Sequence, residues 1–146
     1  MSVASVTGHY AVPEAKHETA NALAGRRVLI VEDEVIVAFS IECEVMDAGG
    51  EIVGPAHTLA DAVRLIDEPI DVAILDINIH GEPVWPIAQA LRERGVPYVL
   101  ASANCDDPRA ADPAFANVPR FDKPVPIARL LAAVALLAQD EPADAL

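Results

Sequence analysis

Basic residues are scarce in this sequence. The chain of 146 residues has 10 Lys and Arg against 23 Asp and Glu, a formal net charge of −13 at pH 7. Nucleic-acid-binding surfaces need clusters of Lys and Arg for the phosphates, and anionic membranes attract basic segments. The composition therefore argues against both a nucleic acid and a membrane as partner.

Long hydrophobic runs are also missing. The most apolar stretch, residues 125–138, is interrupted by Arg129 and is shorter than the roughly 20 residues that span a bilayer. The N-terminus lacks a basic region followed by an apolar run, so we expect no signal peptide and a cytoplasmic protein. The only two cysteines, Cys43 and Cys105, match no metal-ligand spacing. We expect free thiols, with a redox role as the lesser alternative.

Short apolar segments alternate with amphipathic ones. The expected strands are residues 28–31, 52–53, 72–75, 98–101 and 118–121. Expected helices cover 35–47, 59–68, 83–94 and 127–139, and only short turns are expected over 103–118. Such alternation predicts an α/β fold with a parallel, doubly wound sheet and helices on both of its faces.

The second expected helix shows how its buried face is predicted. Thr58 is a plausible N-cap. The apolar stripe has the spacing of one helix face and consists of Leu59, Ala62, Val63 and Ile66.

A single domain accounts for the chain. With 53% hydrophobic residues, the sequence can form a packed core. We expect this domain over residues 25–140, a mobile tail over 1–24 and frayed residues at 141–146.

Charged residues stand where three of the strands end. Glu32 and Asp33 follow the first strand, Asp76 ends the third, and Lys123 follows the last. The carboxyl ends of parallel strands lie at one edge of the sheet, so these four residues should converge there. Carboxylates that share a small site raise one another's pKa unless a cation is present. Lys123 supplies one positive charge, and Mg²⁺ would supply the rest.

Simpler roles are open for the same residues. Glu32 and Asp33 could cap the first helix, because acids favour helix N-termini. Asp76 could cap a turn, and Lys123 could be an ordinary surface lysine.

The order of these residues matches a known family. Val31-Glu32-Asp33-Glu34, Asp76, Ser102 and Lys123-Pro124 each follow a strand, and in this the chain resembles the receiver domain of two-component response regulators. The resemblance covers about residues 26–138, and the chain is similar to short, stand-alone alphaproteobacterial receivers. It implies a flavodoxin-like, five-stranded sheet of order 2-1-3-4-5, which is carried over from the family.

The resemblance implies roles in phosphoryl transfer for three residues. Asp76 would be the phosphoacceptor, a carboxylate that attacks phosphorus. Lys123 would neutralise a phosphoryl oxygen, and Ser102 would donate a hydrogen bond to the phosphoryl group. The bond between Lys123 and Pro124 would be cis.

It also implies a metal site. Glu32 and Asp33 would be the acidic pair that holds Mg²⁺ together with Asp76, with Asp33 the more direct ligand. The backbone carbonyl of Asn78 would complete the metal shell.

Other positions depart from the family or have no assigned role. Arg120 and Asn104 stand where related receivers carry aromatic residues, so the usual Ser/Thr–aromatic coupling is missing. Asn78 and Asn104 would flank the phosphoryl group and tune its hydrolysis. His80 is expected in a solvated loop, with a contact to a partner or to the phosphoryl group as the alternative.

The expected function is that of a single-domain receiver, a signalling module and not an enzyme. A sensor histidine kinase or a phosphotransfer protein would phosphorylate Asp76, and protein–protein contact would carry the output, as relay, phosphate sink or switch. The main alternative is a degenerate receiver that acts as a scaffold without phosphorylation. A phosphatase of the aspartyl-phosphate type would need an acid where Asn78 stands, and a flavodoxin-like cofactor binder would need a phosphate loop after the first strand.

The last helix points to a further contact. Ala135 and Leu136 extend its apolar character beyond the core-facing stripe. In the family, the fourth helix, fifth strand and fifth helix often form a dimer surface, and we expect a homodimer there.

Overall fold

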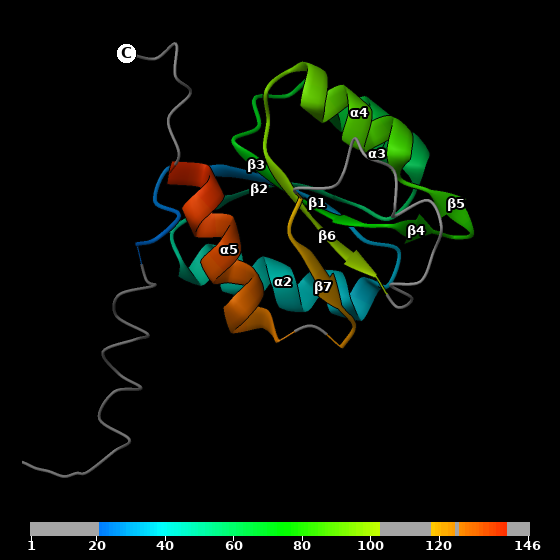
Figure 1. Ribbon diagram of the computed structural model, residues 1–146. Coiled ribbons are helices and arrows are strands. Elements are labelled where there is room, and N and C mark those ends of the chain that lie inside the picture. The colour runs from blue at the N-terminus through cyan, green and yellow to red at the C-terminus, as the bar shows by residue number, and fades with distance from the viewer. Residues whose placement is uncertain (1–20, 103–117, 125, 140–146) are drawn as a thin grey trace, which may run out of the picture.

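The computed structural model describes residues 21–102, 118–124 and 126–139. Its main sheet is parallel, with the order β2-β1-β3-β6-β7 (Figure 1). The strands are β1 (Arg27–Val31), β2 (Glu51–Ala56), β3 (Val72–Asp76), β6 (Tyr98–Ser102) and β7 (Arg120–Asp122). Counted along the chain, these five strands have the predicted order 2-1-3-4-5. The predictions for residues 1–20, 103–117 and 141–146 lie outside the described residues.

Helices cover both faces of this sheet, as predicted (Figure 1). α2 (Val35–Asp47) and α5 (Ile127–Gln139) pack on one face, and α3 (Leu59–Leu65) and α4 (Trp85–Glu93) on the other. Successive strand residues point to opposite faces. In β1, Leu29 therefore joins the core under α3 and α4, while Val28 and Ile30 join the core under α2 and α5. Burial on both faces explains the continuous apolar runs of the strands.

α2 and α5 have the predicted bounds. α2 buries the expected residues Ala38, Ile41 and Val45 against the sheet. β7 is shorter than expected and begins at Arg120 rather than at residue 118.

β2 is longer than predicted. The sequence predicts a strand over residues 52–53 that ends at Gly54-Pro55, but the strand continues to Ala56. Its register with β1 shifts between Leu29 and Val31, next to Gly54. Gly54 has a φ of 101°, and a Cβ atom there would lie 2.8 Å from the amide nitrogen of Ala56. The glycine thus permits an irregularity inside the strand instead of ending it.

α3 confirms the cap and corrects the stripe. The Thr58 hydroxyl accepts a hydrogen bond from the Asp61 N–H (3.1 Å), as predicted for an N-cap. Val63 was predicted to be buried, which is wrong, because 56% of it is exposed. The helix ends at Leu65. The other stripe residues, Leu59, Ala62 and Ile66, pack on the core as predicted, and Leu65 packs there in place of Val63.

A short hairpin follows β3 and was not predicted. β4 (Asn78–Ile79) pairs antiparallel with β5 (Glu82–Pro83) around a turn at His80 and Gly81. Strands of two residues are too short to produce a sequence pattern.

The packed unit begins earlier than residue 25. Leu23 lies in the predicted tail, yet it is fully buried, and its N–H donates to the carbonyl of Ala48 (2.9 Å). The prediction of a mobile tail up to residue 24 is therefore wrong for Leu23. None of the helices in the described ranges is long and apolar enough to cross a membrane.

Candidate functional site

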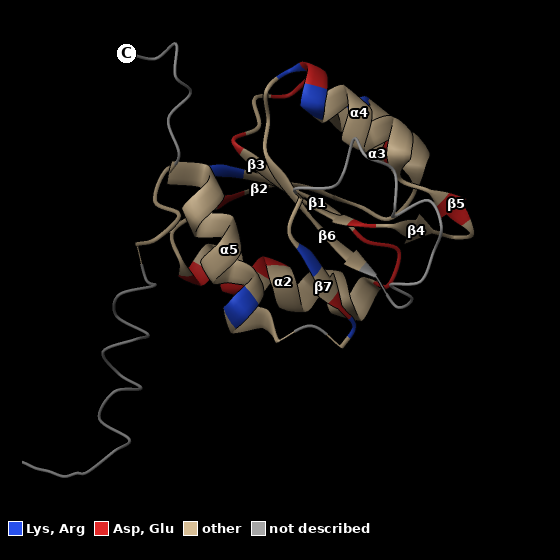
Figure 2. Cartoon of the chain, in the orientation of Figure 1, with Lys and Arg blue, Asp and Glu red and all other residues tan. Residues whose placement is uncertain are grey.

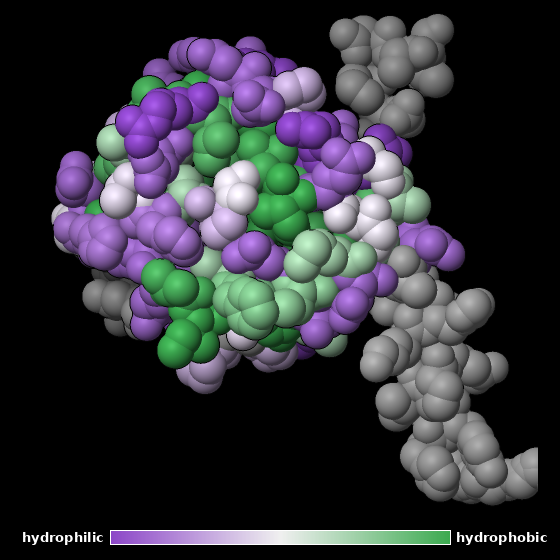
Figure 3. Space-filling model, turned by 180° about the vertical axis from the view of Figure 1, so that it is seen from behind, coloured by the Kyte–Doolittle hydropathy of each residue, from purple (hydrophilic) through white to green (hydrophobic). Residues whose placement is uncertain are grey.

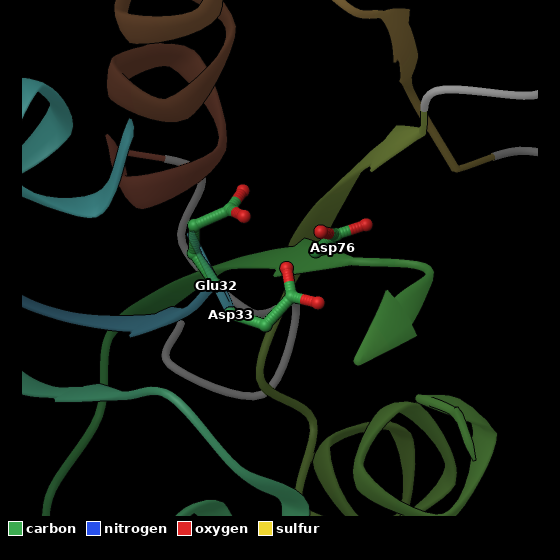
Figure 4. Close-up of side chains that lie close together, drawn as sticks. All are labelled: Glu32, Asp33 and Asp76. Atoms are coloured by element: carbon green, nitrogen blue, oxygen red, sulfur yellow. The ribbon is translucent and has the colours of Figure 1, made fainter. Parts of the chain in front are cut away.

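Three carboxylates meet at the carboxyl edge of the sheet (Figure 4). Glu32 and Asp33 directly follow β1, and Asp76 ends the neighbouring strand β3. One oxygen from each carboxylate lies within 4.8 Å of the others. Glu32 and Asp76 are only 2% and 5% exposed, so these acids are part of the packed structure.

Lys123 completes the cluster from the loop between β7 and α5. Its Nζ lies 2.9 Å from Asp76 Oδ2, 2.9 Å from Glu32 Oε1 and 3.3 Å from Glu34 Oε1. The lysine side chain is 14% exposed, which rules out an ordinary surface lysine. The bond from Lys123 to Pro124 is cis, as the resemblance implies, and the Gly54–Pro55 bond is cis as well.

The protonation of these groups reflects burial and pairing. Burial raises the pKa of Glu32 to about 7, although the amide of Glu34 and the ammonium of Lys123 act in the opposite direction. Burial also raises the pKa of Asp76, opposed mainly by Lys123. For Lys123, burial is outweighed by the hydrogen bonds to Asp76 and Glu32, which raise its pKa. The lysine therefore stays charged at neutral pH, whereas the two buried acids are poorly compensated.

Asp33 is held by the hairpin. Its Oδ2 accepts a hydrogen bond from the His80 N–H (3.0 Å), and the His80 imidazole nitrogen Nδ1 lies 3.9 Å from the same oxygen. Burial would raise the pKa of Asp33, but the hydrogen bond from the His80 amide, together with the interactions with the Glu32 and Asp76 side chains, outweighs burial and lowers the pKa. The His80 side chain is 59% exposed, as expected for a solvated loop. Its backbone, however, is part of the site.

Asn78 and Ser102 also lie at this edge. The Asn78 N–H donates to Asp76 Oδ1 (3.2 Å), and the Asn78 side-chain oxygen accepts from the N–H of Gly81 (2.7 Å). Ser102 is the last residue of β6, one position beyond the residue in register with Asp76. The roles of the Asn78 carbonyl and the Ser102 hydroxyl remain predictions. Asn104 lies outside the described residues.

The structure also tests the simpler capping roles of Glu32, Asp33 and Asp76. The N-cap of α2 is Glu34, without a side-chain cap, so the idea that Glu32 and Asp33 cap this helix is wrong. The Glu32 carboxylate accepts the N–H of Glu34 (3.0 Å), ahead of the helix. Asp76 does accept the N–H of Asn78 in a turn, but its other oxygen binds Lys123.

Sequence reasoning missed two contacts. Glu34 approaches Lys123, and His57 Nδ1 lies 2.9 Å from the backbone carbonyl of Glu32. Both contacts depend on strand register and loop path. An acid next to Glu32 and Asp33 was the only available signal for the first, and the second had none.

An apolar cleft adjoins the cluster. It has a volume of about 480 Å³ and lies between α2 and α5, with Glu32 and Lys123 in its lining. Its apolar walls include Ile36, Val37, Ile41, Ile127 and Leu130.

The donor set fits a hard divalent cation. The oxygens of Glu32, Asp33 and Asp76 are close enough to bind one ion, and Mg²⁺ prefers carboxylate oxygen ligands. With Lys123 as the nearby cation, these acids leave an excess of negative charge that such an ion would neutralise.

Comparison with known proteins gives matches among solved structures. No protein-family model and no curated protein matches the sequence. The chain is 25% identical to a response regulator receiver protein from Sinorhizobium medicae (TM-score 0.68), over 77% of this chain and 94% of that one.

Two further solved structures are similar. One is the receiver domain of the sensor histidine kinase PA1611 from Pseudomonas aeruginosa, with a magnesium ion in its active-site cleft: 20% identity, TM-score 0.67, covering 80% of this chain and all 100% of that domain. The other is the response regulator PhyR from Brucella abortus, with 23% identity and a TM-score of 0.64. That match covers 87% of this chain but only 52% of PhyR.

Proposed function

We propose that this chain, which has the structure of a response regulator receiver domain, accepts a phosphoryl group on Asp76 and works as a signalling module in the cytoplasm, not as an enzyme. The observation that carries this proposal is the contact between Lys123 and Asp76 (2.9 Å). It lies at the edge of the sheet where Glu32 and Asp33 also lie. A buried acid beside a largely buried cation that lines a cleft suits a nucleophile that receives an anionic group.

The reaction needs few parts from the protein. An Asp76 carboxylate oxygen attacks the phosphorus of a phosphohistidine, so that a P–O bond forms while the P–N bond breaks. The leaving imidazole takes up a proton from solvent. Lys123 stays beside Asp76 and pairs with a phosphoryl oxygen, and Ser102 donates a hydrogen bond to another.

Glu32, Asp33 and Asp76 would hold Mg²⁺, and the Asn78 carbonyl would complete its shell. When bound, the ion supplies positive charge that neutralises phosphoryl oxygens during transfer. The His80 amide keeps Asp33 oriented toward the other two acids.

A protein donor must reach Asp76, and α2 offers it an apolar surface. Four large hydrophobic side chains on this helix are exposed, between 53% and 81%. They are Val35, Ile36, Phe39 and Met46. Figure 3 shows apolar surface along the lower edge of the molecule, over α2. The cleft beside Lys123 begins at this surface, since Ile36 lines it. We propose that the sensor histidine kinase or phosphotransfer protein docks here.

Charge adds a requirement for that partner. α2 carries Glu42, Glu44 and Asp47 and no Lys or Arg (Figure 2). A partner with an apolar patch bordered by basic residues would complement this helix, and its association rate would fall with added salt.

Docking can be tested separately from chemistry. The double variant Ile36→Ser/Phe39→Ser should slow phosphorylation by a phosphorylated phosphotransfer protein by about tenfold or more, because apolar anchors dominate such interfaces. Acetyl phosphate needs no docking surface, so its rate should not change. Val63→Ser, an exposed valine on the opposite face, is the matched control. An equal loss with both donors would argue against docking on α2.

We also propose that the protein forms a homodimer through β7 and α5, the last strand and the last helix of the domain. Leu136 on α5 is 71% exposed, which supports an apolar contact. The segment that would complete this surface, residues 103–117, lies outside the described ranges. Sedimentation with and without beryllofluoride should show a dimer that Leu136→Ser weakens, and a monomer at high concentration in both states would oppose it.

The decisive experiment is intact mass after incubation with acetyl phosphate and Mg²⁺. We expect one phosphoryl adduct, absent from Asp76→Asn and in the presence of a chelator. Asp47→Asn, at the exposed end of α2, is the matched control and should be phosphorylated normally. If neither an adduct nor beryllofluoride binding is observed, the chain is a degenerate receiver that acts as a scaffold, and the phosphorylation proposal fails.

A further inference from the structure

The backbone of Glu32 is held on both sides, by the last residue of β2 and by the residue that follows it. Its N–H donates to the carbonyl of Ala56 (2.9 Å), and its own carbonyl lies 2.9 Å from Nδ1 of His57. A carbonyl can only accept, so Nδ1 carries the hydrogen and donates. The second contact is therefore a hydrogen bond from a side chain to the backbone.

The register of the two strands explains why a side chain makes this bond. The pairing of β1 with β2 shifts beside Gly54, and Val31 opposite Ala56 is the last pair in register. His57 is the next residue of the chain. Its imidazole extends the hydrogen-bonded contact between the strands by one step, just where the acidic pair begins.

This bond fixes more than one residue. The carbonyl of Glu32 and the N–H of Asp33 belong to the same peptide group, which is planar and rigid. A donor that holds this carbonyl also fixes the rotation of the plane that joins the two residues. Because both side chains start from this peptide group, its rotation would move both carboxylates relative to Asp76.

We propose that His57 is a positioning residue for the metal site. Its Nδ1–H holds the Glu32–Asp33 peptide plane so that the carboxylates of both residues converge with Asp76. This inference rests on the proposed function, because it takes Mg²⁺ as the ligand of that cluster. Partners just outside a metal site commonly change affinity by tenfold or more.

Two substitutions separate the donor from the bulk of the ring. His57→Asn keeps an N–H donor two bonds from Cβ, the place of Nδ1, whereas His57→Leu keeps volume without a donor. His57→Gln moves the amide one carbon further from the backbone and so displaces the donor. It serves as a second, polar variant in case His57→Leu folds poorly. Val63→Ser, at a residue of α3 that is 56% exposed and makes no contact with the acidic cluster, is the control.

The measurement is the Mg²⁺ dissociation constant of each full-length variant by titration calorimetry, with the melting temperature recorded in chelator. We expect His57→Leu and His57→Gln to bind Mg²⁺ about fivefold or more weakly, the effect of one lost hydrogen bond. His57→Asn should recover to within about twofold, and Val63→Ser should match the unsubstituted protein. Recovery in His57→Asn is a result that general loosening of the fold would not produce.

Two results would overturn the inference while leaving the proposed function intact. These are unchanged Mg²⁺ affinity in His57→Leu and His57→Gln, or a loss in His57→Asn as large as theirs. If the unsubstituted protein itself binds no Mg²⁺, the proposed metal site fails, and the inference fails with it.

Discussion

Lys123 faces more negative charge than it can neutralise. Its ammonium contacts the carboxylates of Glu32, Glu34 and Asp76, and Asp33 lies beside the last of these. Surface ion pairs contribute little to stability, but two of these acids are buried and need compensation. The cluster is therefore suited to take up a second cation, and its stability should depend on pH.

Without metal, the protein should lose stability as pH rises between about 4.5 and 7. The pKa of Glu32 is raised from 4.5 to about 7 by burial, and that of Asp76 is also raised. An acid whose pKa is raised by folding stabilises the folded state at pH values below its pKa in the unfolded chain. This contribution disappears as pH rises through the pKa that the acid has in the folded protein. For Glu32 the full effect is roughly 3 kcal/mol, at about 1.4 kcal/mol per pKa unit.

Thermal melts in chelator at pH 5 and pH 8 measure this effect. The decrease in melting temperature between the two should be several degrees smaller in Glu32→Gln than in the unsubstituted protein. Glu44→Gln, an exposed acid on α2, should show the normal decrease. An equal decrease in all three proteins would contradict the assignment to Glu32.

Mg²⁺ should oppose the loss of stability that occurs as pH rises. At ten times its dissociation constant, a ligand that binds only the folded state adds RT ln 11, about 1.4 kcal/mol, or roughly 5 °C in the melting temperature. The increase should be larger at pH 8 than at pH 5, because the ligands must be deprotonated. Scanning calorimetry of Asp33→Asn should show little increase in melting temperature on addition of Mg²⁺. An increase as large as that of the unsubstituted protein would mean that Asp33 is not a ligand of the metal.

The site was largely predictable from the sequence because its parts follow strands. Parallel strands bring their carboxyl ends together, which is enough to predict that Asp33, Asp76 and Lys123 meet. The contacts of Glu34 and His57 were not predictable, since they depend on the path of a loop and on an irregular register.

Long, periodic elements were predicted well and short ones poorly. α2 and α5 repeat their apolar residues over several turns, which defines both the ends and the buried face. β2 was predicted too short, because Gly54-Pro55 usually ends a strand and here lies inside one. The stripe of α3 was misjudged at Val63 because seven residues hold too few repeats to define a face.

α5 should be sensitive to changes on one side only. Leu130 is fully buried against the sheet, whereas Leu136 on the same helix is 71% exposed. Leu130→Ala should lower the free energy of unfolding by about 2–5 kcal/mol, through lost burial and a cavity, and Leu136→Ala by less than about 0.5 kcal/mol. Urea titration checks both values, and equal effects would mean that α5 is oriented differently.

The chain as a whole carries a large excess of negative charge. With a net charge of −13, self-repulsion should destabilise the compact state at low ionic strength. Raising NaCl from about 10 mM to about 0.5 M shortens the screening length several-fold. In chelator at pH 8, we expect the melting temperature to rise by a few degrees. A fall would mean that salt-sensitive ion pairs, such as those of Arg27, contribute more than the repulsion.

The contacts of Lys123 join distant parts of the sequence, which affects when a newly made chain can assemble its site. The lysine reaches back 91 residues to Glu32 and 47 residues to Asp76. Contacts between such distant segments form late, and parallel sheets that depend on them fold slowly. A chain still emerging from the ribosome has no Lys123 to pair with its acids until the segment that follows β7 has been made. If Asp76 accepts a phosphoryl group as proposed, newly made protein should be unable to do so until β7 and α5 have joined the sheet, so that folding itself delays phosphorylation.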